Sequence, residues 1–325
     1  MLLDVKNLST VFPLKKGTVR AVDNVSFCID KGESLAIVGE SGSGKSVTSL
    51  SVMGLISKPG RVGSGSIVYK DSEDLRFVTK QRMRELRGNE ISMIFQEPMT
   101  SLNPVYTIRF QLVEAIRTHM GMSKDEAADH AVQMLELAGI PSARQRLANY
   151  PHELSGGMRQ RVMIAMALSC NPELLIADEP TTALDVTIQA QIMDLLGELR
   201  SRLGMSLILI THDMGIVAES CERVVVMYCG QVVEEAGVRD LFRGPMHPYT
   251  VGLLASIPRM DRVVRRLTII PGVAPDPLDL PKGCAFYDRC GVRMARCGEE
   301  TPELIENGGR SVRCFRCQNG GCADG

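Results

Sequence analysis

The feature that most constrains the fold is a glycine-rich segment, G-x-x-x-x-G-K-S at Gly39–Ser46, which directly follows an apolar run at Ser34–Val38. Glycines at these places let the chain curl until successive backbone N–H groups face a phosphate, and the start of the following helix adds positive potential. The spacing predicts a phosphate-binding loop in which Lys45 reaches the β- and γ-phosphates and the Ser46 hydroxyl binds Mg²⁺. An incidental glycine- and serine-rich turn is the less favoured interpretation.

Apolar runs of strand length alternate with helical patterns, which is typical of an α/β protein with a buried sheet. The predicted strands are Ser34–Val38, Ile91–Phe95, Leu174–Ala177, Ser206–Ile210 and Val224–Met227. From Phe110 to Gly139 a helical pattern takes over, and Ser123 with Glu126 forms a capping-box pattern. We therefore expect a helical subdomain at about residues 100–158, inserted into a domain of residues 1–245.

Composition excludes several classes of protein. The chain has 325 residues, 44% of them hydrophobic, and a formal net charge of −1. It is therefore not a disordered chain, and it lacks the basic surplus typical of bulk nucleic-acid binding. No apolar run approaches the roughly 20 residues that cross a bilayer. The start, Met1–Lys6, has no basic segment followed by an apolar one, so we expect a cytosolic protein.

Two further segments have the residues expected for phosphate binding and phosphoryl transfer. The apolar run Leu174–Ala177 ends in Asp178 and Glu179, an arrangement in which one carboxylate can hold Mg²⁺ and the next can polarise a water. Leu154–Met158 contains S-G-G at the start of a helical run, so Ser155, Gly156 and Gly157 offer helix N–H groups to a second phosphate. A phosphate-binding loop and a second phosphate-binding helix start in one chain predict a pair of molecules. Each molecule would cover the nucleotide that the other one binds.

Taken in order, these segments resemble those of ABC transporter ATPases. The matching residues are the Walker A motif at Gly39–Ser46, Gln96, the signature at Leu154–Met158, the Walker B motif with Glu179, Ala183-Leu184-Asp185 and Thr211-His212-Asp213. The resemblance implies an α/β fold, an ABC-type P-loop ATPase with a RecA-like sheet core, an antiparallel β part and an inserted helical subdomain.

The resemblance also implies residue roles. Glu179, His212 and Gln96 would be catalytic, with His212 at the γ-phosphate, and Mg²⁺ would be held by Ser46, Gln96 and Asp178. Phe12 would stack on adenine, although a structural role for this ring stays open. The implied ATP-binding residues are Phe12, Gly39, Glu40, Ser41, Gly42, Ser43, Gly44, Lys45, Ser46, Val47, Ser155, Gly156, Gly157 and Asp185.

Within that superfamily, Gln96–Pro104 and His247-Pro248-Tyr249-Thr250 resemble ATPases of oligopeptide and dipeptide importers. The resemblance implies a peripheral protein on the cytoplasmic face of the membrane. Its partners would be a second ABC ATPase (a homologous chain or a copy of itself), two transmembrane permeases and, indirectly, an extracytoplasmic substrate-binding protein, with no nucleic acid.

Other readings remain open. Nickel or glutathione importers are related alternatives. A non-transport ABC ATPase is disfavoured, because only 57 residues separate Gln96 from Leu154 and the chain has a single Walker A motif. That interval is too short for the long coiled-coil insertion of the chromosome-structuring ATPases.

A proline-broken extension, residues 246–325, holds six of the ten cysteines, all within the last 42 residues. A reducing cytosol argues against disulfides and leaves metal binding, redox chemistry or chance. Around Cys284–Cys290 the extension resembles that of peptide-importer ATPases with a [4Fe–4S] cluster, which implies a structural cluster on Cys284, Cys290, Cys297 and Cys314. Zinc and unligated thiols stay open as alternatives, and Cys317 and Cys322 are left over.

Overall fold

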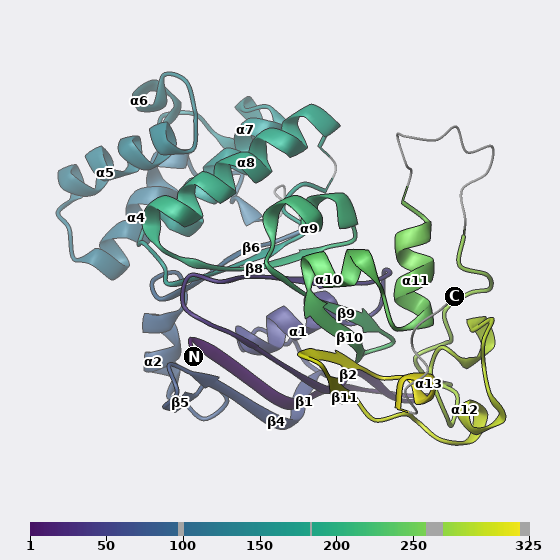
Figure 1. Cartoon of the computed structure of the whole chain (residues 1–325). Coiled ribbons are helices and arrows are strands. Elements are labelled where there is room, and N and C mark those ends of the chain that lie inside the picture. Colours follow the sequence, from purple (N-terminus) through teal and green to yellow (C-terminus); the bar gives the residue numbers. More distant parts are fainter. Residues whose placement is uncertain (97–100, 183, 258–268, 319–325) are drawn as a thin grey trace. The chain divides into compact units, whose positions relative to one another are not determined.

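The chain folds into two compact units (Figure 1). The computed structural model describes residues 1–96, 101–182, 184–257 and 269–318. The first unit comprises Met1–Ile29, Ser34–Arg76 and Thr211–Gly325, and the second comprises Asp30–Glu33 and Phe77–Ile210. None of the helices in these described ranges is both long enough and apolar enough to cross a bilayer.

An antiparallel sheet with the strand order β2-β1-β4-β5 forms one part of the first unit. Its strands are β1 (Leu3–Leu14), β2 (Gly17–Ile29), β4 (Arg61–Tyr69) and β5 (Glu73–Asp74). β1 and β2 form a hairpin that places Phe12 opposite Val19. Alternate residues of β1, such as Leu3 and Val5, are buried, as expected for a sheet with one face on the core. The predicted antiparallel part is therefore present.

A second set of strands in the first unit follows the order β11-β12-β10-β9-β3. Its strands are β3 (Ser34–Val38), β9 (Arg223–Tyr228), β10 (Gln231–Gly237), β11 (Ile305–Asn307) and β12 (Arg310–Val312). β3 runs parallel to β9 and is buried at every residue, which confirms the strand predicted before the phosphate-binding loop. β12 pairs with β10, so the C-terminal extension adds a short hairpin that its proline-broken sequence did not reveal.

Short helices complete the first unit. They are α1 (Lys45–Val52), α9 (Met214–Ser220), α10 (Val238–Arg243), α11 (Pro248–Ala255), the 3-10 turn η2 (Tyr287–Arg289), α12 (Ala295–Glu299) and α13 (Phe315–Gln318). His247 caps α11, because its Nδ1 accepts the Tyr249 N–H at 3.0 Å. Complete burial lowers the pKa of His247 to about 3, so the ring stays neutral and keeps this acceptor.

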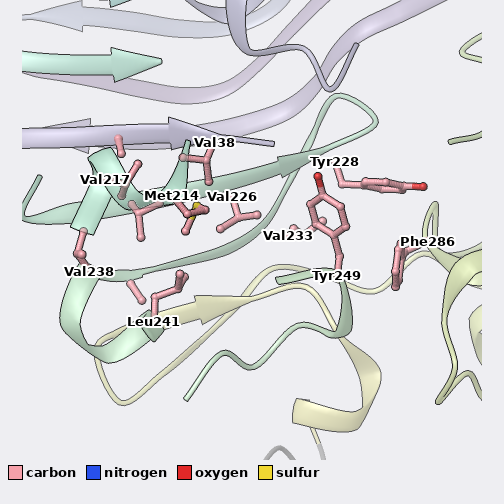
Figure 2. Close-up of a cluster of buried hydrophobic side chains, with 13 residues drawn as sticks. Val38, Met214, Val217, Val226, Tyr228, Val233, Val238, Leu241, Tyr249 and Phe286 are labelled. Carbon is pink, nitrogen blue, oxygen red and sulfur yellow. The ribbon is translucent and has the colours of Figure 1, made fainter. Parts of the chain in front are cut away.

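An apolar cluster ties the extension to the core of the first unit (Figure 2). Tyr228 of β9 lies 4.7 Å from Tyr249 of α11 and 5.3 Å from Phe286 of the extension, measured between ring centroids. Tyr249 and Phe286 are 5.5 Å apart with their rings edge to face, a favoured geometry for aromatic pairs. The extension therefore shares a hydrophobic core with the strands that flank the phosphate-binding loop.

The second unit contains the parallel strands β6 (Ile91–Ile94), β7 (Leu174–Asp178) and β8 (Ser206–Thr211), in the order β6-β7-β8. All three are buried along their length, as their continuous apolar runs predict. The helices and turns of this unit are α2 (Lys80–Leu86), α4 (Ile108–Met120), α5 (Lys124–Leu137), α6 (Ala143–Arg146), the 3-10 turn η1 (Pro151–Glu153), α7 (Gly156–Leu168) and α8 (Val186–Leu203).

Helices α4, α5 and α7 contact one another. The predicted capping box of α5 is confirmed: Glu126 N–H donates to Ser123 Oγ, and Ser123 N–H donates to a Glu126 carboxylate oxygen at 2.9 Å. The predicted helical stretch is divided in two, because α4 ends before Gly121, whose φ of +65° is left-handed. Gly139, with φ of +72°, follows the end of α5 as expected.

Candidate functional site

The glycine-rich loop joins β3 to α1 in the first unit, and its path leaves no room for side chains at two positions. A Cβ at Gly39 would lie 2.2 Å from the carbonyl oxygen of Met227, and one at Gly44 would lie 2.3 Å from that of Ala21. Both glycines also have positive φ, 154° and 99°, which other residues rarely adopt. The loop is therefore held by backbone of β9 on one side and of β2 on the other.

Lys45 is the first residue of α1 and is only 5% exposed. Its Nζ donates to the carbonyl oxygens of Gly39 and Glu40, at 2.8 and 3.0 Å. The ammonium is thus held across the mouth of its own loop. Beside it, the buried hydroxyl of Ser43 has no hydrogen-bond partner within the described residues. An unpartnered buried hydroxyl next to a lysine and a helix N-terminus fits a loop built for phosphate.

Ser46 and Val47 are partly exposed on the first turn of α1.

A cavity of about 230 Å³ adjoins the other end of the loop. Its lining is formed by Val19, Arg20, Ala21, Glu40, Ser41, Gly42, Ser43, Tyr228, Cys229, Gly230, Ala274, Pro275, Pro277 and Leu280. Phe12 does not line it: its ring lies against Gly60 and close to Ile56, while its cross-strand partner Val19 does. The cavity wall includes residues of the C-terminal extension, which sequence reasoning did not connect with this loop.

In the second unit, β7 ends in the buried Asp178, and Glu179 follows with the left-handed φ of +46°. This conformation is costly for a residue with a side chain. It is supported by the Glu179 N–H, which donates to the Ile210 carbonyl at 2.8 Å. The bend turns Glu179 away from the path of the strand.

Gln96 and Glu179 are brought together, as the resemblance implies. Gln96 Nε2 donates to Glu179 Oε2 at 2.9 Å, and Thr182 Oγ1 donates to the same oxygen at 2.9 Å. Two donors on one carboxylate oxygen fix the direction of the side chain. Thr182 was missed by sequence reasoning, because a threonine three residues after an acid carries no distinguishing pattern.

The signature residues stand at the start of α7. Ser155 is its N-cap, and its Oγ accepts the Met158 N–H at 3.3 Å. A Cβ at Gly157 would lie 3.1 Å from Ile188 of α8, so the two helices pack closely at this point. Asp185 is the N-cap of α8 and accepts the Ile188 N–H at 2.9 Å. The signature residues and Asp185 therefore all stand at the start of a helix, where backbone N–H groups are hydrogen-bond donors.

His212 belongs to the first unit, comes directly after the last residue of β8 and is exposed. The next residue, Asp213, caps α9 through its carboxylate, which accepts the Gly215 and Ile216 N–H groups. Glu97 to Thr100, Ala183 and Cys322 lie outside the described residues.

The four cysteines predicted as ligands line one small cavity, together with His247 and Phe286. Burial raises the pKa of Cys284 to about 11, and the thiols of Cys297, Cys290 and Cys314 add to this rise. Burial also raises the pKa of Cys290 and of Cys314. Cys317 is disulfide-bonded, so the argument against disulfides in the extension is wrong at this residue. Within the described part of the chain, no group of three or more Cys, His, Asp or Glu side chains is arranged to hold a metal ion.

Two family descriptions match the chain, "ABC transporter" over residues 22–182 and "Oligopeptide/dipeptide transporter, C-terminal region" over residues 233–297. The oligopeptide transport ATP-binding protein AppD of Bacillus subtilis is 56% identical over 97% of this chain and 96% of its own length. The dipeptide transport ATP-binding protein DppD of Haemophilus influenzae is 53% identical over 96% and 94%.

The chain belongs to the ABC transporter family. Oligopeptide transport ATP-binding protein OppD of Salmonella typhimurium is 50% identical over 97% of this chain and 94% of its own. Among solved structures, the dimeric ATP-binding cassette MJ0796 bound to ADP and Pi matches with a TM-score of 0.66 and 29% identity, over 73% of this chain and 99% of its own. This ABC transporter protein is therefore an ATPase with the expected mixed α/β fold.

For this ABC ATPase we expect Glu179→Gln to lower the hydrolysis rate about 100-fold or more, because the amide cannot take a proton from the attacking water. ATP binding should be nearly unchanged, since Gln96 and Thr182 still have an oxygen to which they can donate. Turnover and ATP affinity of the purified protein would be measured separately. Glu198→Gln, an exposed change on α8, is the matched control, and hydrolysis by Glu179→Gln at the rate of this control would contradict the assignment.

Proposed function

We propose that this chain is the ATP-hydrolysing subunit of an ABC importer for oligopeptides or dipeptides. The observation that carries the proposal is that the chain matches relatives named for oligopeptide or dipeptide transport at 50 to 56% identity, over almost the full length of both chains. The match to the oligopeptide/dipeptide C-terminal region, residues 233–297, supports it independently of the ATPase core. Uptake of nickel or glutathione by a related importer is the second candidate.

In this proposal the first unit binds the nucleotide. The residues Gly39–Val47 hold the phosphates through backbone N–H groups, and Lys45 adds its ammonium. Lys45 already faces the mouth of the loop, where two carbonyl oxygens hold it. Phe12, opposite Val19 on the β1–β2 hairpin, is our candidate for the residue that stacks on adenine. His212 is our candidate for the residue that contacts the γ-phosphate.

In the second unit Glu179 orients and polarises the attacking water, and Gln96 and Thr182 keep its carboxylate in place. Because the amide nitrogen of Gln96 donates to Glu179, its amide oxygen is the atom left to bind Mg²⁺. Ser46 and Asp178 would complete the protein ligands with a hydroxyl and a carboxylate, a set of hard oxygens that suits this ion. Bound Mg²⁺ would neutralise charge that develops on the phosphates.

The signature residues Ser155, Gly156 and Gly157, together with Asp185, would face the nucleotide of a second ABC ATPase, either a homologous chain or a second copy. Support comes from their place at helix starts, where N–H groups and the helix dipole attract anions. Two transmembrane permeases would anchor the pair at the cytoplasmic face of the membrane, and an extracytoplasmic binding protein would deliver the substrate. The boundaries at 1–245 and 246–325, with helices inserted at about 100–158, are part of this proposal.

We further propose that Cys284, Cys290, Cys297 and Cys314 hold a structural [4Fe–4S] cluster. Four thiols around one cavity are the donor set of such clusters. Zinc bound by the same four thiolates and unligated thiols are the alternatives to the cluster.

The importer proposal predicts that the tagged chain co-purifies from membranes with two permeases and an ABC ATPase partner. ATP hydrolysis by the assembly in vesicles should rise with a peptide-loaded binding protein and not with nickel or glutathione. Mass spectrometry of the purified assembly and phosphate release would report the two results. Purification without any membrane subunit would contradict a role in transport, and stimulation by nickel or glutathione would favour the second candidate.

The shared-site proposal predicts that Ser155→Asp abolishes ATP-dependent dimerisation, because a negative charge would meet the γ-phosphate of the partner. Aspartate is also a good helix N-cap, so α7 should keep its start. Ser155→Asn keeps the cap without the charge and is the matched control. Light scattering in the Glu179→Gln background, alone and with the co-purifying ATPase, would measure the dimer, and equal dimerisation of the Asp and Asn variants would contradict the shared site.

The cluster proposal predicts a brown protein after anaerobic purification, with broad absorbance near about 400 nm and about four irons per chain. Cys297→Ser should lower the iron content and loosen the extension, while the ATP site still binds nucleotide, although more weakly where the extension no longer holds the loop. Cys28→Ser, a thiol on β2 outside the cavity, is the control and should keep its iron. Stoichiometric zinc without iron under the same conditions would refute the cluster.

A further inference from the structure

Glu40, the second residue of the phosphate-binding loop, has all three of its polar groups engaged. Its N–H donates to the hydroxyl of Tyr249 at 2.9 Å, and its carbonyl oxygen accepts from Lys45 Nζ at 3.0 Å. Its carboxylate accepts two hydrogen bonds from Arg289, at 2.7 and 3.0 Å. Of these partners, Lys45 belongs to the loop itself, whereas Tyr249 and Arg289 lie in the C-terminal extension.

Arg289 is fixed on the side of the extension as well. Its Nε donates to the carbonyl oxygen of Pro271 at 3.0 Å, and Nη1 also donates to the Tyr228 hydroxyl at 3.3 Å. The guanidinium lies 5.7 Å from the ring centre of Tyr228 and 5.9 Å from that of Phe286, within the range of a cation–π contact. The Arg289 side chain is only 6% exposed and that of Glu40 is 32% exposed, so the guanidinium end of the pair is shielded from most of the solvent.

The fork of two hydrogen bonds fixes the direction of the Glu40 carboxylate as well as its distance from Arg289. The residues after Glu40 are Ser41, Gly42, Ser43 and Gly44, and the glycines give such a run a conformational freedom that contacts from outside the loop have to restrain. A loop of this kind loses entropy when it closes on a phosphate, and any group that holds it in the bound shape beforehand lowers that loss. Glu40 is the residue of the loop through which Tyr249 and Arg289 of the extension supply such a restraint.

We propose that Arg289 is a positioning residue of the nucleotide site: from the C-terminal extension it holds Glu40, and with Tyr249 it keeps the phosphate-binding loop in its binding shape. In this proposal Arg289 acts through Glu40. The effect therefore falls on nucleotide affinity, whereas Glu179 carries out its step unaltered. The inference rests on the ATP site described above and gives the extension a part in that site.

The test is a double-mutant cycle on the full-length protein, with the dissociation constant for ADP measured by calorimetry. Arg289→Gln and Glu40→Gln should each weaken ADP binding about tenfold, the scale for losing a charged hydrogen bond. The double variant should be weaker by about the same tenfold rather than by the product, because either single change already breaks the contact. For Arg289→Gln, KM for ATP should rise while kcat changes less than about twofold.

Arg296→Gln is the matched control, because Arg296 pairs with Glu300 in the same extension but is 58% exposed and lies outside the loop contacts. It should bind ADP like the wild type. Arg289→Lys keeps the charge without the fork and should recover part of the affinity.

Tyr249→Phe guards against a folding artefact, because it keeps the ring and removes only the acceptor of the Glu40 N–H. It should weaken ADP binding about threefold, as a neutral hydrogen bond would. Wild-type ADP affinity in both Arg289→Gln and Tyr249→Phe would overturn the inference, and so would independent effects of Arg289→Gln and Glu40→Gln. Failure of the wild-type protein itself to bind ADP would instead count against the proposed ATPase function.

Discussion

The phosphate-binding loop takes its shape from two close backbone contacts, and the nucleotide chemistry depends on them. Gly39 meets the Met227 carbonyl of β9, and Gly44 meets the Ala21 carbonyl of β2, at distances that exclude any side chain. Between these two points the chain is forced into the curve that places Lys45 across the mouth of the loop. Lys45 is therefore positioned by the strands that flank the loop as much as by the loop itself.

Glu179 illustrates a second constraint, a strained backbone at the point of chemistry. Its left-handed φ costs energy of the order of 1–3 kcal/mol, which the hydrogen bond from its N–H to Ile210 and the packing of buried β7 help to offset. The strain turns the carboxylate out of the strand, where Gln96 and Thr182 hold one of its oxygens. A fixed carboxylate direction is what the proposed role of Glu179 as general base requires.

The C-terminal extension is built into the core of the first unit. Phe286 and Tyr249 pack on Tyr228 of β9, and β12 extends the strand pairing of β10. Arg289, which pairs with Glu40, lies between Cys284 and Cys290 in the sequence. One short segment therefore carries both a wall of the thiol cavity and a contact to the phosphate-binding loop, so changes in either can reach the other through a few bonds.

The sequence by itself determined the features that depend on short-range chemistry. β3 and its glycine-rich turn, the buried parallel strands and the Ser123 capping box were all predictable, because the motifs that specify them lie within a few consecutive residues. Only the tertiary structure decided that Thr182 shares Glu179 with Gln96, that four dispersed cysteines line one cavity, and that Arg289 holds Glu40 across 249 positions of sequence. Such contacts have no periodicity or spacing to reveal them, because they arise when separately folded segments bury their apolar faces together and bring distant polar groups within hydrogen-bond range.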